Sequence, residues 1–334
     1  MVDPLPEDPR LKDISPKAYE HPADRAATAA LQNIPMLNAV VRKLIEYGYE
    51  RAFQQLLLAS AVRIGEDQLP EVWAAHRAAL ARLDIQEVPS LYMAQMPIIN
   101  AMAVGSTKPM VVLNSRTVDV LDANELRTVL GHEAGHILSD HILYTTALQI
   151  LLNIGVGPLL RLPFFAGLPL LAVQLALLEW ARAAELTCDR AATLVNRSPM
   201  TTCQTLMVVA GGAASRRLSL DAFVRQANEY EDWEPGWDKL SRLRSELFLT
   251  HPYPVRRVSE LMKWVRSGEY DRIVGGDYRK RGQRADAREE AGDAAEFYTE
   301  RFRSLFREVG EGVNKAGDKV TDAADRVTDW LKQR

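Results

Sequence analysis

The sequence HEAGH at residues 132–136 contains two histidines and a glutamate at a spacing that can bind and use a metal ion. Side chains four residues apart lie one turn apart on the same face of a helix, so His132 and His136 can face one ion. Glu133 is rotated off that face and can instead take a proton from water, as metal-assisted hydrolysis requires. The spacing therefore predicts two zinc ligands and a general base.

The residues before this motif predict that it lies on a helix. Asp122 or Asn124 is a suitable N-cap, and Glu125 is favourable in the first turn. Apolar residues then recur at helical spacing from Leu126 to Ile137. We therefore expect a helix that begins near Asp122 and carries both histidines on one face.

A catalytic zinc ion needs a third protein ligand. His141 is the nearest candidate, but five residues beyond His136 it points away from the two-histidine face of a continuous helix. Glu185 and Asp189 are four residues apart in a second helical pattern, where alanines make the neighbouring face small. We expect Glu185 to bind the metal and Asp189 to accept the outer N–H of a ligand histidine, which fixes its tautomer. Solvated carboxylates on a helix surface are the alternative.

Together these residues resemble the HtpX and CaaX-prenyl endopeptidase family of gluzincin zinc metallopeptidases. Glu185 and Asp189 match the family's ExxxD motif, and Arg257 stands where the family carries an arginine after its His-Pro segment, here His251-Pro252. Further matches in the same order are residues 88–92, 100–105 and 110–114, so that the resemblance spans residues 83–265. It implies a zinc-dependent metalloendopeptidase with one Zn²⁺ per chain that hydrolyses peptide bonds in protein or peptide substrates. A role in membrane-associated protein quality control is a further implication.

His251 and Asn100 are expected near the substrate, and Arg257 is expected beside the metal ligands. His251 precedes a proline, which favours an extended backbone, so its ring can project into a cleft and donate a hydrogen bond to the oxyanion. A structural role is the equal alternative, and only the resemblance brings the catalytic role level with it. Arg257 is expected to be an ion-pairing residue beside the metal ligands. Asn100 can present backbone or amide groups near the cleft, with a turn-forming asparagine as an equal alternative.

The short β-branched run at residues 110–114 predicts a strand beside the cleft. As an edge strand it would bind an extended peptide by strand addition, through Val111, Val112 and Leu113. A plain core strand is the equal alternative.

Length, charge and cysteine content narrow the class of protein. The chain has 334 residues, with 41 Lys and Arg against 44 Asp and Glu, and its net charge of −3 gives no footprint for nucleic acid. Its two cysteines, Cys188 and Cys203, cannot form a disulfide framework, and no apolar signal segment follows Met1. Both observations predict a cytoplasmic protein.

The whole pattern predicts an α+β, predominantly helical zincin-like (gluzincin) domain with a small sheet, an N-terminal helical layer and a C-terminal amphipathic helical tail. We expect an N-terminal helical region at 1–82, the metallopeptidase domain at 83–265, a Gly-rich linker at 266–296 and the tail at 297–334. The tail is expected to dock on the domain or to mediate self-association, with binding to a membrane surface as the alternative.

Residues 142–178, between the two metal motifs, contain a single charged residue, Arg161. The two apolar runs approach the roughly 20 residues of a spanning helix, but both are short and contain glycines and prolines. A transmembrane pair and a buried or interfacial hairpin are therefore equal alternatives. We expect a cytoplasmic enzyme that associates peripherally with a membrane or an apolar partner.

A second class of function stays open. A catalytically silent zinc-binding protein, acting as a chaperone-like or membrane-binding module, would keep the metal ligands but would have no need for Glu133. The intact motif therefore favours the peptidase.

Overall fold

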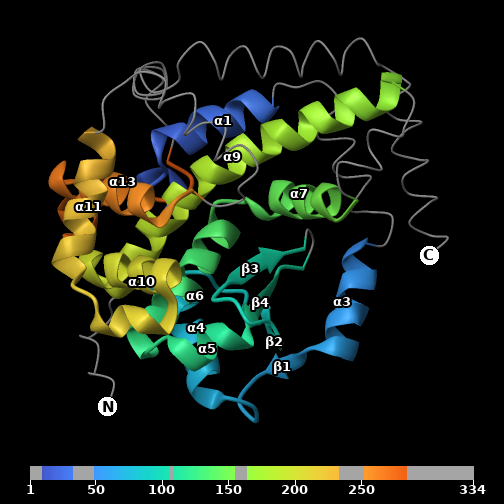
Figure 1. Ribbon diagram of the computed structural model, residues 1–334, viewed down its shortest axis with the longest axis horizontal. Helices are drawn as coiled ribbons and strands as arrows, with labels where there is room; N and C mark the ends of the chain where they lie inside the picture. Colours follow the sequence, from blue (N-terminus) through green and yellow to red (C-terminus); the bar gives the residue numbers. More distant parts are fainter. Residues whose placement is uncertain (1–9, 33–48, 106–107, 155–163, 233–251, 284–334) are drawn as a thin grey trace.

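The computed structural model describes residues 10–32, 49–105, 108–154, 164–232 and 252–283. These residues form a mostly helical structure with a small four-stranded sheet, as the sequence predicts (Figure 1). The long helix α9 (Phe164–Asn196) runs diagonally across the upper part of the view. Helix α6 (Ala123–Leu138) packs against both α9 and the sheet.

The other helices of the described residues range from short 3-10 turns to helices of several turns. In chain order they are η1 (Pro16–Ala18), α1 (Pro22–Gln32), α3 (Tyr49–Ser60), α4 (Pro70–Arg82), α5 (Ser115–Val120), α7 (Ile142–Ile154), α10 (Pro199–Gly211), η2 (Gly212–Arg217), α11 (Leu220–Asp232), α13 (Pro254–Arg266) and α14 (Glu269–Val274). The strands are β1 (Val62–Ile64), β2 (Ser90–Ala94), β3 (Ala101–Val104) and β4 (Met110–Asn114).

The strands pair in the order β1-β2-β4-β3, so β4 lies in the interior of the sheet. It pairs in parallel with β2 and antiparallel with β3, and its residues Val111 and Leu113 are fully buried. The expectation that residues 110–114 form an edge strand is therefore wrong, and the alternative, a core strand, is confirmed. A β-branched run suits an edge strand and an interior strand equally well. The sequence of the run does not show whether a second strand will pair with it. The edge strand next to α6 is β3.

Helix α6 begins where the sequence predicts. The Asp122 carboxylate accepts hydrogen bonds from the backbone N–H groups of Asn124 and Glu125, and the Glu125 side chain accepts from the backbone N–H of Asp122. This capping box satisfies N–H groups that a helix end otherwise leaves unpaired. Arg216 of η2 pairs with the buried Glu125 and so ties the start of α6 to a neighbouring layer.

Helices α6 and α9 pack closely because glycines of α6 face α9. A Cβ atom on Gly135 would lie 2.8 Å from the Cβ of Ala191 and 3.2 Å from the Cα of Cys188. A Cβ atom on Gly131 would lie 3.0 Å from the Cβ of Val195. Larger residues at either position would push the helices apart, so the two glycines set the distance between α6 and α9.

The N-terminal segment contacts the same long helix. Helix α1 runs beside α9 (Figure 1), where the Trp180 indole N–H donates to Thr28 and the backbone N–H of His21 donates to Thr187. Helix α3 contacts the sheet, and its Leu57 is buried there. Residues 10–32 are therefore joined to the helix that carries Glu185 by side chains as well as by packing.

Part of the segment expected to be a linker is folded. Helix α14 follows α13 closely, and its Tyr270 and Ile273 are buried in the core. The expected linker start at residue 266 is therefore wrong, because a packed helix follows that residue. The chain turns after this helix, at Gly276, which has φ +96°. The C-terminal tail at 297–334 lies outside the described residues.

The apolar segment 142–178 contributes α7 and the first part of α9. Helix α7 packs against α9 and β3, and its Ala147, Leu148 and Leu151 are buried. Within the described part of the chain, no helix is both long and apolar enough to cross a membrane. Residues 155–163, between α7 and α9, lie outside that part.

Candidate metal centre and cleft

Helices α6 and α9 bring three side chains with metal-binding groups together. His132 and His136 come from consecutive turns of α6, and Glu185 faces them from α9. The Nε2 atom of His132 lies 3.3 Å from one carboxylate oxygen of Glu185, and Nε2 of His136 lies 3.2 Å from the other. All three side chains are buried. Two imidazole nitrogens thus converge on one carboxylate.

These separations fit a tetrahedral zinc site. Bonds of about 2.0–2.1 Å from zinc to nitrogen or oxygen, at tetrahedral angles, place neighbouring ligand atoms about 3.3 Å apart. The nitrogen–oxygen distances of 3.2 and 3.3 Å, each to a different oxygen of Glu185, are close to that spacing. Two histidines and a glutamate are also a ligand set that catalytic zinc sites use. The residues present therefore fit zinc.

Charged residues also surround the other ring nitrogen of His132, Nδ1. Its Nδ1 atom lies 3.2 Å from Asp189, one turn along α9 from Glu185. Arg257 of α13 donates to both carboxylate oxygens of Asp189, at 2.7 and 2.6 Å, and a guanidinium nitrogen lies 3.3 Å from Glu185. The two-point contact fixes the Asp189 carboxylate, which in turn orients the imidazole.

Buried charges shift the ionisation of this cluster. Burial lowers the pKa of His132, but the carboxylates of Glu185 and Asp189 outweigh burial and raise the pKa to about 10. Burial lowers the pKa of His136 to about 4, despite its contact with Glu185. Burial raises the pKa of Asp189, but Arg257 outweighs it and the net shift is downward. The carboxylates thus favour one positive charge on the imidazoles, a charge that a zinc ion would replace.

Cys188 is a competing candidate ligand. Its Sγ atom and one nitrogen each of His132 and His136 lie within 4.8 Å of one another. Burial raises the pKa of Cys188 well above its ordinary value, and thiolates rather than thiols bind metals. Its Sγ also lies 3.7 Å from His141, beside the Nδ1 atom of His136. Glu185 is the better third ligand, because its oxygens contact both Nε2 atoms.

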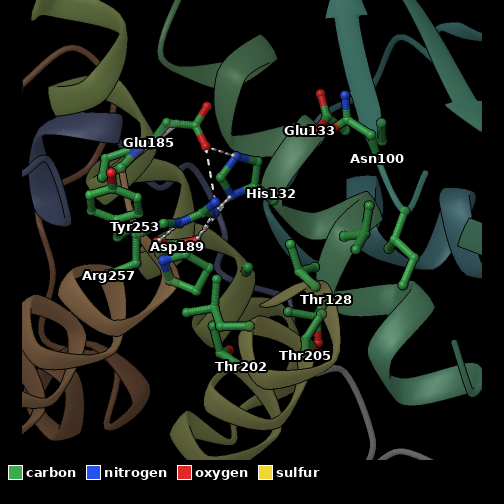
Figure 2. Close-up of a pocket in the computed structure, with 18 of the residues that line it drawn as sticks. Asn100, Thr128, His132, Glu133, Glu185, Asp189, Thr202, Thr205, Tyr253 and Arg257 are labelled. Carbon is green, nitrogen blue, oxygen red and sulfur yellow. Dashed lines mark hydrogen bonds and ion pairs between the residues drawn. The ribbon is translucent and has the colours of Figure 1, made fainter. Parts of the chain in front are cut away.

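A cavity of about 450 Å³ opens beside these side chains (Figure 2). His132, Glu133 and Glu185 line it, as do Asn100 and Ala101 at the start of β3. In Figure 2, Glu133 lies on the side of His132 where Asn100 lies, away from Asp189 and Arg257. The Glu133 carboxylate is therefore in the cleft and outside the cluster that surrounds His132.

The structure places the other predicted substrate residues differently. Val111, Val112 and Leu113 are buried in β4, behind the edge strand β3, and they are not among the residues that line the cavity. The prediction that they bind substrate is wrong for the same reason that β4 is not an edge strand. His251 lies outside the described residues, whereas the next two residues, Pro252 and Tyr253, line the cavity.

Two buried residues near His136, namely His141 and Asp24, were given no role from the sequence. His141 Nδ1 lies 3.2 Å from His136 Nδ1, and His141 Nε2 lies 3.0 Å from Asp24 of α1. The expectation that His141 points away assumes a continuous helix, whereas α6 ends at Leu138 and Asp140 turns the backbone with φ +58°. His141 does not lie on the side of the two Nε2 atoms; it contacts the Nδ1 atom of His136 instead. No spacing pattern connects Asp24 with this region.

An HExxH helix packed against a second helix with an ExxxD motif, at the edge of a cleft, defines an HExxH-type zinc metallopeptidase. Comparison with known proteins identifies the family: residues 68–265 match Peptidase family M48, and the chain belongs to this family. It is a zinc metallopeptidase that acts on protein or peptide substrates. The resemblance, the enzyme class and the zinc cofactor expected from the sequence are therefore confirmed.

The chain is similar to several curated proteins. It is 34% identical over 271 residues to plastoglobule-localized metallopeptidase 48, chloroplastic, of Arabidopsis thaliana. The aligned segment covers 79% of this chain and 77% of that protein. It is 38% identical over 68 residues to a protease HtpX homolog of Helicobacter acinonychis, 20% of this chain and 22% of that protein. A Helicobacter pylori HtpX homolog is 34% identical over 84 residues, 24% of this chain and 27% of that protein. No solved structure matches the chain significantly.

Proposed function

We propose that His132, His136 and Glu185 bind the zinc ion and that Glu133 is the general base of peptide hydrolysis. The observation that carries this assignment is the convergence of both Nε2 atoms on the Glu185 carboxylate at 3.2–3.3 Å. The assignment also agrees with the position of Glu133, which lines the cleft beside them.

Asp189 and Arg257 support the metal ligands in this proposal. Asp189 accepts a hydrogen bond from Nδ1 of His132, so the lone pair of Nε2 is left for the metal. Arg257 compensates the charge of Asp189 and prevents its carboxylate from rotating, because it binds both oxygens.

Bound zinc supplies a Lewis acid for the scissile carbonyl and for water. Glu133 takes a proton from the attacking water and then passes it to the leaving amine. We also propose that His251 donates a hydrogen bond to the oxyanion. The positions of Pro252 and Tyr253 in the cleft wall support this role, since they bring the chain next to His251 to the site.

We propose that the substrate backbone pairs with the free edge of β3. The carbonyl of Asn100 accepts a hydrogen bond from the N–H of Asn114 on β4. The N–H of Ala101, on the opposite side of the same planar peptide, therefore points away from the sheet. Farther along this edge, the N–H of Gly105 donates to the Thr146 hydroxyl, which donates in turn to the carbonyl of Gly105. Ala101 lines the cleft, where an extended peptide can add as a strand.

The cleft favours an uncharged substrate side chain near the scissile bond. One part of its wall carries hydroxyl and methyl groups without any charge, from Thr128, Val129, Thr202, Thr205, Leu206 and Val209. A charged side chain there would lose hydration without gaining a partner. We therefore propose that the enzyme prefers a small or apolar residue at this position.

Replacement of the general base tests the assignment. Glu133→Gln keeps the size of the side chain but cannot accept the proton, so kcat on a quenched fluorescent peptide falls by about 100-fold or more. Its zinc content, measured by atomic absorption, stays at the wild-type value. His136→Ala is the matched variant, since it should lose both zinc and activity.

Two outcomes would change the conclusion. Unchanged cleavage by the Glu133→Gln protein would refute the role of Glu133. Wild-type protein that binds zinc but cleaves none of a broad set of peptides and unfolded proteins would favour the chaperone-like or membrane-binding alternative.

We further propose that the enzyme is cytoplasmic and contacts a membrane surface or an apolar partner through residues 142–178, and that residues 297–334 mediate self-association. The support is the single charge in the first segment and the amphipathic pattern of the second. The localisation in the name of the Arabidopsis relative is that protein's own. Sedimentation of cell membranes at physiological salt, without carbonate, tests the membrane contact, and complete recovery of the protein in the supernatant would exclude it.

A further inference from the structure

Behind His136, three buried side chains form a chain of contacts that ends on helix α1. His136 Nδ1 lies 3.2 Å from His141 Nδ1, and His141 Nε2 lies 3.0 Å from Asp24 Oδ2. Asp24 is fully buried, and His141 is nearly so. Helix α1 precedes residues 68–265, which match the family, so this contact comes from a part of the chain outside that match.

A metal bound at Nε2 of His136 allows a single arrangement of protons along these contacts. Because the lone pair of Nε2 faces the metal, neutral His136 carries its hydrogen on Nδ1. His136 then donates to Nδ1 of His141, which must accept with its lone pair. His141 consequently carries its hydrogen on Nε2 and donates it to the carboxylate of Asp24.

The surroundings of Asp24 are those of a buried acceptor. The Thr187 hydroxyl donates to one carboxylate oxygen at 2.6 Å, and the Thr28 hydroxyl donates to the other at 3.1 Å. Nε2 of His141 lies 3.0 Å from the same oxygen that Thr187 contacts, so three groups that can donate surround this carboxylate. Without these partners a buried carboxylate would be strongly unfavourable. The site therefore holds a hydrogen-bond acceptor that faces His141.

The ring of His141 is also held in place. The indole of Trp180 lies against it edge to face, with ring centroids 5.4 Å apart and planes at 88°. Cys188 Sγ lies 3.7 Å from His141 Nδ1, and a thiol is a weak donor. If Nδ1 of His141 carries a lone pair, it can accept from both of its neighbours, His136 and Cys188.

We propose that Asp24 and His141 are positioning residues of the zinc site, which fix the tautomer and the ring orientation of His136 and make α1 a part of the catalytic unit. This inference rests on the proposed role of His136 as a zinc ligand. Asp189 acts on His132 directly, whereas Asp24 acts on His136 through an intervening imidazole. Outer partners of this kind change metal affinity by about 10–100-fold.

Zinc affinity of the full-length protein, measured by competition with a chromophoric chelator, tests the proposal. Asp24→Leu keeps a side chain of similar size but removes the acceptor, and we expect its zinc dissociation constant to rise about 10–100-fold. Asp24→Asn retains an oxygen that can accept from His141, so it should recover most of the affinity. Glu260→Leu is the control, because it removes the acceptor that contacts His21 at 3.4 Å, a contact that also anchors the N-terminal segment. Its zinc affinity should stay within about twofold of wild type, since the orienting contact is retained.

The outcomes separate this inference from the ligand assignment. If His136→Ala binds zinc as tightly as wild type, the assignment of His136 as a ligand is wrong. If His136→Ala loses zinc while Asp24→Leu keeps wild-type affinity, the ligand assignment stands and the positioning role is overturned. Equal losses of affinity in Asp24→Leu and Glu260→Leu would also overturn it, because they would indicate general loosening of the N-terminal segment.

A second measurement needs no substitution and therefore does not depend on the folding of a variant. Two-bond proton–nitrogen spectra of the zinc-loaded wild-type protein report which ring nitrogen of each histidine carries hydrogen. We expect hydrogen on Nδ1 of His136 and on Nε2 of His141. Hydrogen on Nδ1 of His141 together with a bare Nε2 would overturn the proposal.

Discussion

Each proposed ligand histidine has a buried partner at its Nδ1 atom. Asp189 contacts His132, and His141 contacts His136. Burial of Asp189 and Arg257 removes both ions from water at a cost of several kcal/mol each, and their attraction offsets that cost only in good geometry. Such a cluster contributes little to the stability of the fold. Its arrangement is better explained by the orientation that it imposes on the imidazoles.

The contact between His21 and Glu260 makes stability depend on pH. Burial raises the pKa of Glu260, but the hydrogen bond from His21 and the charge of Lys263 lower it to about 2, and burial lowers the pKa of His21. Both folded-state values lie below the ordinary ones, so the unfolded chain binds more protons on acidification. Stability is therefore full above the ordinary pKa of histidine and falls as the pH drops, first through His21 and then through Glu260.

Glu260→Gln should flatten this dependence. From pH 6.5 to pH 4, the wild-type protein should lose about 1 kcal/mol more unfolding free energy than the variant, from the Glu260 shift alone. Urea unfolding followed by circular dichroism at both pH values measures the difference. The zinc site contributes to both proteins, so it cancels in the comparison. Parallel losses in the two proteins would show that Glu260 does not contribute.

At the scale of residues, the sequence predicts those site residues that are spaced at helical intervals within one segment. His132, Glu133 and His136 follow from their spacing on one helix, and Glu185 and Asp189 follow from a second such spacing. Asp24 and His141 could not be predicted, because their contact joins a helix near the N-terminus to a residue just beyond the end of α6. Neither has a neighbour in sequence that indicates the partner.

At the scale of elements, the distance between α6 and α9 decides whether the metal-binding groups meet. The HEAGH motif includes Gly135, which faces Ala191 and Cys188 at contact distance. The motif thus specifies both the chemistry of its histidines and the close approach of the helix that supplies Glu185. A side chain at this glycine would separate His136 from Glu185.

Gly135→Ala tests the importance of this close approach. Alanine favours a helix over glycine by about 1 kcal/mol, but a Cβ atom 2.8 Å from the Cβ of Ala191 forces the helices apart. We expect a net destabilisation of about 1–3 kcal/mol, as for other overpacked cores, together with weaker zinc binding. Thermal unfolding and chelator competition measure the two effects.

The matched rescue is the double variant Gly135→Ala/Ala191→Gly, which removes the facing Cβ atom. It should recover most of the zinc affinity, even though glycine weakens α9 by about 1 kcal/mol. A single variant that is more stable than wild type and keeps its zinc would contradict this account of the packing.

The free edge of β3 offers a second test at this scale. Ala101→Pro removes an N–H group that points away from β4, and edge strands tolerate proline at such positions. Loss of one backbone hydrogen bond to substrate, about 0.5–1.5 kcal/mol, should raise KM by roughly 2–12-fold with little change in Tm. Met102→Pro is the control, because its N–H faces β4, so it should lower Tm. Unchanged peptide kinetics in a folded Ala101→Pro protein would exclude strand addition there.

The elements themselves were predictable to different degrees. The start of α6 was predicted because capping is local to Asp122 and Glu125. The position of β4 was not, since a five-residue β-branched run carries no information about how many partners it will have. The early linker boundary failed for a similar reason: glycines in a turn and glycines in a linker look alike until Tyr270 and Ile273 are seen in the core.

At the scale of the molecule, the site is assembled from four separate parts of the chain. Helix α1 supplies Asp24, α6 supplies the two histidines, α9 supplies Glu185 and Asp189, and α13 supplies Arg257. The N-terminal helix and the helices of the family match therefore meet around one pair of imidazoles.

The four parts of the site are synthesised in a fixed order, because they lie far apart along the chain. Asp24 leaves the ribosome well before its partner His141. Arg257, on α13, leaves the ribosome after both metal motifs. Until then, Asp189 and Glu185 lack their shared cation. The charged cluster around His132 can therefore be complete only after Arg257 has been synthesised, so we expect a shorter nascent chain to bind zinc more weakly than the full-length protein.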